Sequence, residues 1–227
     1  TQSPSSAASD VYKRQIESIS FPKSEKFLVV DCTGVNKSEK LLEPYFERKA
    51  SYVLISAPIE SSNVQNIVYG INHQSIDTSA YKIFTAASCT TNCLAPIVKV
   101  LEENIGIKHG SITTIHNITN SQTIVDAPKN NLRRSRSGIN SLIPTTTGSA
   151  RAISLIYPEL KGRLNGHAVR VPLLNASLTD CVFEMKQNVE VDKINQLFNE
   201  ASNTYLRDIL SYEEKPLVSS DYVNNPH

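Results

Sequence analysis

The first half of the chain carries short, uniformly apolar runs separated by polar stretches. The runs lie at Phe27–Asp31, Tyr52–Ser56, Val68–Asn72 and Lys82–Thr85. Strands that are apolar on both faces are typical of a parallel sheet covered on both sides. A polar helix is expected between the first two runs. The pattern therefore predicts part of a doubly wound α/β domain over about residues 27–88.

The second half shows segments in which apolar and polar residues alternate instead. The alternating segments are Ser111–His116, Gly166–Val171 and Ser177–Glu184. Alternation predicts strands with one buried and one exposed face, as in a mixed or antiparallel sheet. Helices are predicted at Thr90–Asn104, at Ala150–Tyr157 and over residues 191–202. The predicted fold class is α/β followed by α+β.

Composition and charge narrow the function classes. With 227 residues, 40% hydrophobic and 20% charged, the chain fits one large or two small globular domains. A net charge of +1 gives no bias toward nucleic acid or acidic membranes. No apolar run approaches the roughly 18–20 residues that span a bilayer. The four cysteines show no disulfide-rich spacing, which favours a reduced, cytoplasmic setting.

The chain opens on a stretch unlike the rest. Residues 1–14 are rich in serine and lack apolar periodicity. We expect them to be a disordered tail or sequence foreign to the fold.

Cys89 is the strongest candidate for chemistry. It stands between an expected strand, Tyr81–Ala87, and the start of the following helix. The helix dipole and the free N–H groups at a helix start favour the thiolate. His116 lies on the next expected strand, so the two predict a nucleophile and its base. A histidine in this position equally fits a buried strand residue.

The remaining cysteines suggest a structural role. Cys32, Cys93 and Cys181 fit small buried apolar residues. The spacing from Cys89 to Cys93 is a poor zinc pattern, because no second Cys or His pair stands nearby. No metal is expected.

Several features suggest that a negatively charged ligand binds near the thiol. Arg170 stands among apolar neighbours, and Thr145–Ser149 precedes a helix whose start could bind phosphate. Arg133, Arg134 and Arg136 cluster in the long segment from 117 to 140, a length typical of functional loops. Each feature alone fits a solvated strand face, an ordinary helix cap or a surface patch. Together they predict a cysteine enzyme acting on a phosphorylated carbonyl compound.

A dinucleotide fingerprint is missing. None of the eight glycines forms a Gly-x-Gly pair, and no acidic residue ends a second strand to bind a ribose. The residues alone therefore do not name a cofactor.

The string Ser88-Cys-Thr-Thr-Asn-Cys93 resembles the active-site signature of phosphorylating glyceraldehyde-3-phosphate dehydrogenases. The similarity covers roughly residues 27–227 through many colinear motifs. They are Cys32–Val35, Ile55–Pro58, Gly70–His73, Thr113–His116, Leu132–Arg136, Ile143–Gly148, Pro158–Gly162 and Val169–Pro172.

The resemblance implies a fold and an assembly. Residues 15–88 would be part of a Rossmann domain that binds NAD or NADP. Residues 89–227 would be a catalytic domain with a mixed, mainly antiparallel sheet, cut short at its C-terminus. The segment 117–140 would pack against a neighbouring subunit of a homotetramer.

The resemblance also implies residue roles. Cys89 would attack the aldehyde, and His116 would take the hydroxyl proton as hydride leaves to the nicotinamide. Thr119 and Arg170 would hold the substrate phosphate. The inorganic phosphate would be held by Ser88, Arg134, Thr147 and Gly148, and Thr90 would also be a substrate- or phosphate-binding residue. The cofactor would contact Thr33, Gly34, Ser56 and Asn120.

Residues 144–149 and 164–180 resemble a bacterial subgroup encoded with arsenate-resistance transporters, in which arsenate replaces phosphate as acceptor. The two anions are too alike for any residue to separate them, and NAD is not separated from NADP. The family's glycine-rich opening and its last strands are missing, so we expect an internal fragment. Two alternatives stay open: an erythrose-4-phosphate dehydrogenase, and a non-catalytic assembly module.

Overall fold

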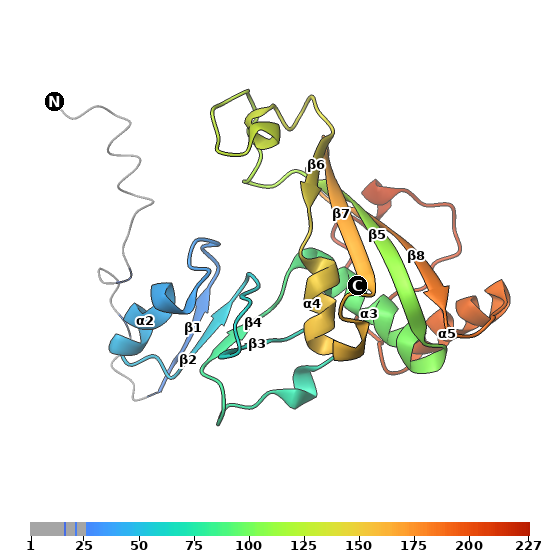
Figure 1. Cartoon of the computed structure of the whole chain (residues 1–227), viewed down its shortest axis with the longest axis horizontal. Helices are drawn as coiled ribbons and strands as arrows, with labels where there is room; N and C mark the ends of the chain where they lie inside the picture. The colour runs from blue at the N-terminus through green and yellow to red at the C-terminus, as the bar shows by residue number, and fades with distance from the viewer. Residues whose placement is uncertain (1–15, 17–20, 22–25) are drawn as a thin grey trace. The chain divides into compact units, whose positions relative to one another are not determined.

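The computed structural model describes residues 16, 21 and 26–227 (Figure 1). The tail expected at 1–14 lies outside the described residues. The chain forms two compact units. The first ends at Ala87 but omits Val68–Gln74, and the second combines Val68–Gln74 with Ser88–His227.

A four-stranded parallel sheet forms the first unit. Its order is β1 (Leu28–Asp31), β2 (Tyr52–Ile55), β4 (Ile83–Thr85) and β3 (Val64–Asn66). Every neighbouring pair is parallel. This confirms the predicted α/β class.

One helix, α2 (Glu39–Glu47), packs on this sheet in the described part of the chain. Its Leu42 and Tyr45 are buried with Val53 and Ile55 of β2. The spacing of Leu42 and Tyr45 places both on one helix face. Exposed Leu28 and Val30 lie on β1, so the cover expected on both faces is incomplete there.

The strand expected at Val68–Asn72 is wrong. These residues form a turn, in which the Asn72 side chain accepts from Val68 N at 2.8 Å. Gly70 has φ +80°, which an extended strand does not allow. The third strand lies earlier, at Val64–Asn66.

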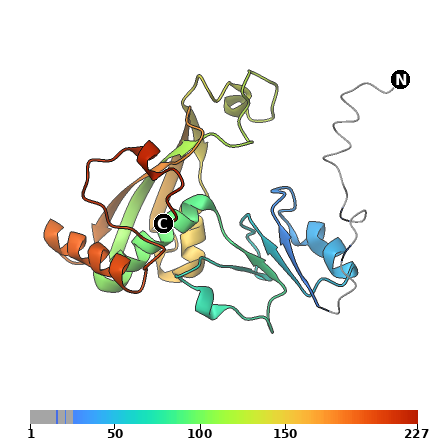
Figure 2. The ribbon, with the colours of Figure 1, turned by 180° about the vertical axis from the view of Figure 1, so that it is seen from behind.

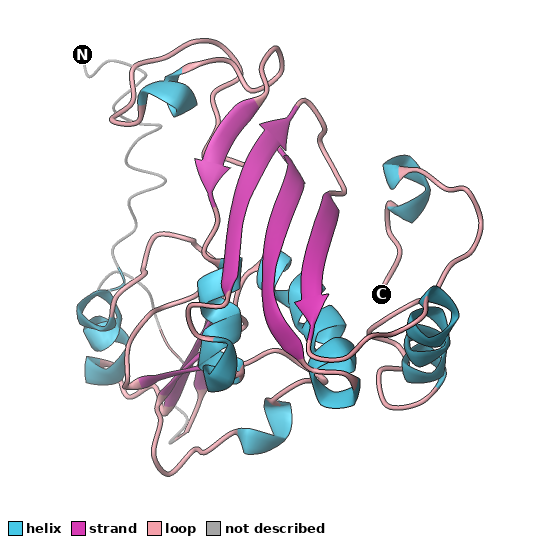
Figure 3. Ribbon diagram, turned by 45° about the vertical axis from the view of Figure 1, so that its right-hand side comes forward, coloured by secondary structure: helices cyan, strands magenta, loops and turns pink. Residues whose placement is uncertain are grey.

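The second unit is built on a mixed four-stranded sheet (Figure 3). Its order is β6 (Ile143–Thr146), β7 (Leu164–Val171), β5 (Ile107–Asn117) and β8 (Leu178–Met185). β5 pairs parallel with β7, and the other two pairs are antiparallel. The expectation of a mixed, mainly antiparallel sheet is confirmed.

Three helices accompany this sheet: α3 (Cys89–Asn104), α4 (Ser149–Ile156) and α5 (Val191–Asn203). α3 contacts β5, β8, α4 and α5, and α4 contacts β7 (Figure 2). Short 3-10 turns lie at His73–Ser75, Leu132–Ser135, Pro158–Leu160 and Ser219–Tyr222. No helix among the described residues is long and apolar enough to cross a membrane.

The alternation of β5 sorts the sheet into two faces. Ile112, Thr114 and His116 are buried, whereas Ser111 on the opposite face is exposed. Strand register carries this division to the neighbours: Arg170 of β7 is the register partner of His116. We call the face of His116 and Arg170 the inner face and the other the outer face. Candidate site residues therefore gather on the inner face.

Candidate active site

Cys89 is the first residue of α3. Ser88 is the N-cap, with extended backbone, and its Oγ accepts from Thr91 N at 3.2 Å. That bond satisfies one N–H of the first helical turn. Cys89 itself is exposed, and Thr90 behind it is buried. The thiol therefore stands where the helix dipole favours an anion.

His116 approaches this sulfur from β5. Its Nε2 lies 3.4 Å from Cys89 Sγ, and its side chain is buried. The hydrogen bond from His116 is the main reason that the pKa of Cys89 is lowered to about 7. Partial burial opposes this, and the hydroxyl of Thr90, 3.9 Å away, adds a small lowering effect. The structure thus brings together the two residues predicted as nucleophile and base.

Arg170 reaches His116 along the inner face. Its Nη1 lies 2.7 Å from His116 Nδ1 and donates to the Asn117 carbonyl at 2.9 Å. Its Nε is buried and has no hydrogen-bond partner among the described residues. Burial lowers the pKa of Arg170, the Cys89 sulfur raises it, and the Arg134 guanidinium lowers it. Cys89, Arg134 and Arg170 are therefore electrostatic neighbours.

Arg134 lies in the loop between β5 and β6. The side chain of Asn131 accepts from Arg133 N and Arg134 N, which caps the short 3-10 turn Leu132–Ser135. Arg134 then donates to Thr145 Oγ1 of β6 at 3.1 Å. Its Nε, like that of Arg170, is buried and has no hydrogen-bond partner in the part of the chain that the structure describes. Loop geometry thus sets the position of this guanidinium.

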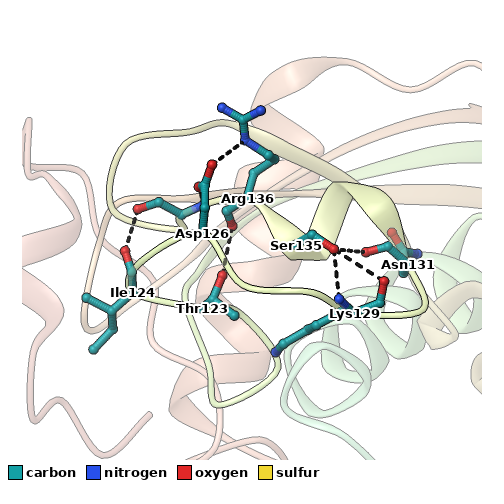
Figure 4. Close-up of polar contacts among 8 residues, drawn as sticks. Thr123, Ile124, Asp126, Lys129, Asn131, Ser135 and Arg136 are labelled. Atoms are coloured by element: carbon teal, nitrogen blue, oxygen red, sulfur yellow. Dashed lines mark hydrogen bonds and ion pairs between the residues drawn. The ribbon is translucent and has the colours of Figure 1, made fainter.

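The same loop is held by its own polar contacts (Figure 4). Arg136 pairs with Asp126 at 3.0 Å, and Thr123 Oγ1 donates to the Arg136 carbonyl at 3.2 Å. Ser135 Oγ accepts from Lys129 N at 3.0 Å. The ion pair with Asp126 therefore holds the Arg136 side chain within the loop. Of the three clustered arginines, Arg134 is the one that reaches the inner face.

Neither Arg134 nor Arg170 forms an ion pair with a carboxylate within the part of the chain that the structure describes. Two partly buried guanidinium groups without counter-charge attract an anion. The fixed planar donors of arginine suit phosphate in particular.

Thr147 and Gly148 stand at the start of α4. Gly148 is the N-cap and has open space where a Cβ would be. Thr147 Oγ1 accepts from Ser149 N at 3.3 Å, and its methyl group faces Gly166 of β7. The N-terminus of α4 therefore lies at the same strand end as Thr145, the partner of Arg134.

Thr119 and Asn120 follow β5 in the exposed loop. Thr119 bonds within this loop, to Ser121 Oγ at 3.0 Å and to Gln122 Oε1 at 3.3 Å. Among the described residues no hydrogen bond links Thr119 or Asn120 to Cys89 or His116. Their assignment to the site rests on sequence, since they follow His116 by three and four residues.

A cavity of about 320 Å³ opens beside the Cys89 sulfur. Its walls include three residues that the sequence did not indicate: Asn117, Ser177 and Thr179. Ser177 Oγ accepts from Asn117 N at 3.1 Å, which fixes the segment before β8 against the end of β5. Asn117 directly follows His116 in the sequence, and this position next to the predicted base could have identified it as a site residue.

The expectation that the other cysteines are buried is wrong. Cys32 and Cys93 are exposed, and Cys181 is partly exposed. Cys93 lies on the open side of α3, and its thiol donates to Thr179 Oγ1 at 3.7 Å. Desolvation of the sulfur raises the pKa of Cys93, and burial raises that of Cys181 to about 11. Of Cys89, Cys93 and Cys181, Cys89 therefore has the thiol that ionises at the lowest pH.

A sequence model described as "Glyceraldehyde 3-phosphate dehydrogenase, C-terminal domain" matches residues 88–227, more than half of the chain. The chain belongs to the glyceraldehyde 3-phosphate dehydrogenase family.

Curated relatives of that family agree over most of the chain. Glyceraldehyde-3-phosphate dehydrogenase 3 of Nostoc sp. is 57% identical over 200 residues, which is 88% of this chain and 59% of the relative. Glyceraldehyde-3-phosphate dehydrogenase 1 of Bacillus cereus is 46% identical over 86% of this chain and 58% of the relative. The enzyme of Geobacillus stearothermophilus is 43% identical over 92% and 62% respectively. The chain thus spans about three fifths of the relatives' length.

The residues expected to bind the family's dinucleotide cofactor follow strands of the first unit. Thr33 and Gly34 come after β1 and Ser56 after β2, and all three are exposed. The carboxyl ends of parallel strands are where such sheets bind ligands. Gly34 has φ +68° and open space around it, which leaves room for close approach of a ligand.

Asp31, at the end of β1, organises that edge. Its buried carboxylate accepts from Thr33 N at 2.8 Å, Thr33 Oγ1 at 2.7 Å, Asn36 Nδ2 at 2.7 Å and Tyr45 OH at 3.1 Å. Burial raises the pKa of Asp31, but these hydrogen bonds outweigh it and the pKa is lowered. This role was not predictable from the sequence, in which Asp31 is simply the last residue of an expected strand.

Proposed function

We propose that the whole protein oxidises glyceraldehyde 3-phosphate to an acyl phosphate through a thioester on Cys89. The observation that carries the proposal is the 3.4 Å approach of His116 Nε2 to the Cys89 sulfur at a helix start. The uncompensated guanidinium groups of Arg134 and Arg170 beside that sulfur suit a phosphorylated substrate.

The first half-reaction uses the nucleophile and the base. The Cys89 thiolate attacks the aldehyde carbon, and the carbonyl oxygen takes a proton from His116 to give a thiohemiacetal. The Cys89 backbone N–H and the imidazole stabilise the negative charge that develops on this oxygen. His116 then takes back the hydroxyl proton as the carbon loses hydride, which leaves a thioester. When bound, NAD or NADP supplies the acceptor of that hydride.

The second half-reaction transfers the acyl group. An oxygen of inorganic phosphate attacks the thioester carbon, the carbon–sulfur bond breaks, and Cys89 returns as thiolate. Thr119 and Arg170 would hold the phosphate of the substrate. The attacking anion would be held by Ser88, Arg134, Thr147 and Gly148, and Thr90 would also contact the substrate or an anion. Arsenate has nearly the same shape and charge, so we include it as a second possible acceptor.

Cofactor binding in this proposal uses exposed residues that follow strands. Thr33, Gly34 and Ser56 would hold the adenosine side, and Asn120 would contact the nicotinamide. The exposed positions of all four support this assignment.

The uncovered outer face of the sheet supports a homotetramer. Leu178 and Val182 of β8 are more than half exposed on that face, and Ile115 and Val169 lie beside them in register. Exposed apolar patches on a sheet are typical of subunit contacts. Val182→Asp should dissociate the assembly in sedimentation, whereas Val191→Asp at the exposed start of α5 should not.

The direct test of the reaction is trapping of the acyl group. The whole protein is incubated with NAD and glyceraldehyde 3-phosphate without phosphate or arsenate, and peptides are mapped by mass spectrometry. We expect the phosphoglyceryl mass on the Cys89 peptide and its release when phosphate is added. Greater labelling from erythrose 4-phosphate would instead favour that substrate. Labelling absent from Cys89 with either aldehyde would overturn the proposal.

A further inference from the structure

Gln122 is a buried polar side chain in the loop that follows β5. Only 8% of its surface is exposed, whereas Thr119 and Asn120 just before it are exposed. Its Nε2 is buried and has no hydrogen-bond partner among the described residues. Burying an amide nitrogen without an acceptor is costly, and a methionine would fill a similar space without that cost. The polar group of Gln122 therefore needs an explanation beyond packing.

The oxygen of this amide accepts hydrogen bonds from the turn that precedes it. Gln122 Oε1 lies 3.1 Å from Thr119 N, 3.3 Å from Thr119 Oγ1 and 3.2 Å from Ser121 Oγ. A backbone N–H can only donate, so the amide oxygen, and not the nitrogen, faces Thr119. Gln122 N also donates to Thr119 O at 3.0 Å. Gln122 therefore holds this turn through both its backbone and its side chain.

The stem of Gln122 is itself confined. A Cβ atom built on Gly138 would lie 3.0 Å from Gln122 Cβ and 3.3 Å from Gln122 Cγ, so the two residues are closely packed. Gly138 N donates to Thr123 O at 2.7 Å, which fixes the glycine against the residue after Gln122. The amide oxygen thus has a set position from which it can orient the hydroxyls of the turn.

Two adjacent hydroxyls result from this arrangement. Thr119 Oγ1 and Ser121 Oγ are 3.0 Å apart, and Gln122 Oε1 is an acceptor within reach of both. A hydroxyl carries one proton, which rotates to suit the acceptors around it. A phosphate oxygen is charged and is therefore a stronger acceptor than an amide oxygen. Both hydroxyl protons can turn to a phosphate group while Thr119 N keeps its bond to Gln122.

We propose that Gln122 is a positioning residue that sets the Thr119 and Ser121 hydroxyls for a phosphomonoester. It acts on the binding of the phosphate group and takes no part in the chemistry at Cys89. The inference rests on the proposed function, which assigns the substrate phosphate to Thr119 and Arg170. It adds the buried residue through which the sequence after β5 becomes selective for phosphorylated substrates.

The test is calorimetric titration of the whole protein with glycerol 3-phosphate, an unreactive phosphomonoester, so that binding is read without turnover. Gln122→Met keeps the length of the side chain and removes the amide. We expect the Kd for the probe to rise by roughly 3- to 10-fold, the effect of one hydrogen bond. Gln187→Met, at an exposed position just after β8, is the matched control and should bind the probe like the wild type. An unchanged Kd in Gln122→Met would overturn the inference.

A double-mutant cycle separates positioning from general damage to the loop. In a background of Thr119→Val and Ser121→Ala, which removes both hydroxyls, Gln122→Met should add less than about a twofold change in Kd. Additive effects would show a merely structural role and would overturn the inference. So would a wild-type protein that does not bind the probe, even if none of the variants folds.

Acyl trapping on Cys89 is measured separately. A thioester that forms while Gln122→Met binds the probe like the wild type would contradict this inference and spare the proposed function. A protein that forms no thioester but shows the expected coupling between Gln122 and the hydroxyls would do the reverse.

Discussion

His116 and Arg170 are register partners on the parallel strands β5 and β7. Residues paired in this way point to the same face of a sheet, so two side chains 54 positions apart meet at 2.7 Å. Thr145, whose hydroxyl accepts a hydrogen bond from Arg134, lies on the same face. Thr179, whose hydroxyl accepts a hydrogen bond from the Cys93 thiol, lies on that face as well. Sheet register thus assembles the site around the start of α3.

Loss of the imidazole should raise the pKa of Cys89. His116→Asn removes the hydrogen bond that is the main cause of the lowered value. The midpoint of thiol ionisation should move from about 7 toward the ordinary thiol value of about 8.5. Turnover should fall by about 100- to 10,000-fold, the range for loss of a general base. His167→Asn, on the exposed outer face, is the control and should leave both quantities unchanged.

Much of this architecture could be predicted from sequence, because strand and helix patterns are local. The runs and the alternation of apolar residues predicted the parallel and the mixed sheet. The junction between an expected strand and an expected helix predicted that Cys89 lies at a helix start. The turn at Val68–Asn72 did not, because its apolar residues suggest a strand while Gly70 and the Asn72 side chain impose a turn. A glycine at positive φ and a local side-chain hydrogen bond override the strand preference of the apolar residues here.

The site was predictable only in part, because some of its features depend on tertiary packing. Cys89 and His116 carried their own signals, but the exposure of Cys93 depends on what packs against α3. The meeting of Arg134 with Thr145 depends on the path of a long loop. Neither can be read from spacing alone.

Arg134 should matter for the acceptor anion, and Arg133 should not. Arg134→Ala removes one charge-assisted contact, which is worth about 1.5–3 kcal/mol. The KM for phosphate should rise by roughly 10- to 100-fold, since every 1.4 kcal/mol is tenfold. Arg133→Ala changes an exposed side chain of the same turn and should leave that KM unaltered. Equal effects of the two variants would count against the assignment.

The N-cap of α3 should contribute to stability as well as to the site. Ser88→Ala removes the bond to Thr91 N and should cost about 1 kcal/mol in the free energy of unfolding. Urea denaturation measures this cost. Asn188→Ala, at an exposed position in the turn before α5, should stay within about 0.5 kcal/mol of the wild type. A Ser88 variant as stable as that control would show that the cap is dispensable.

Acid should weaken the first unit through Asp31. Its pKa is lowered in the folded state, so its contribution is present above the unfolded-state value of about 3.9 and is lost as pH falls through the folded value. Tyr45→Phe removes one bond to this carboxylate and should cost about 1–2 kcal/mol at neutral pH. The cost should shrink in acid, where Asp31 is protonated. Tyr52→Phe, whose hydroxyl has no such bond to Asp31, should show no pH-dependent difference from the wild type.

The central claim is that Cys89 ionises selectively because His116 lies beside it. Its most direct test is the pH dependence of alkylation by iodoacetamide under native conditions, resolved for each cysteine by peptide mass spectrometry. The account predicts that Cys89 reacts far faster than Cys93 or Cys181, with a midpoint near the pKa of about 7. Equal rates at the three cysteines, or a Cys89 midpoint at the ordinary thiol value, would contradict it.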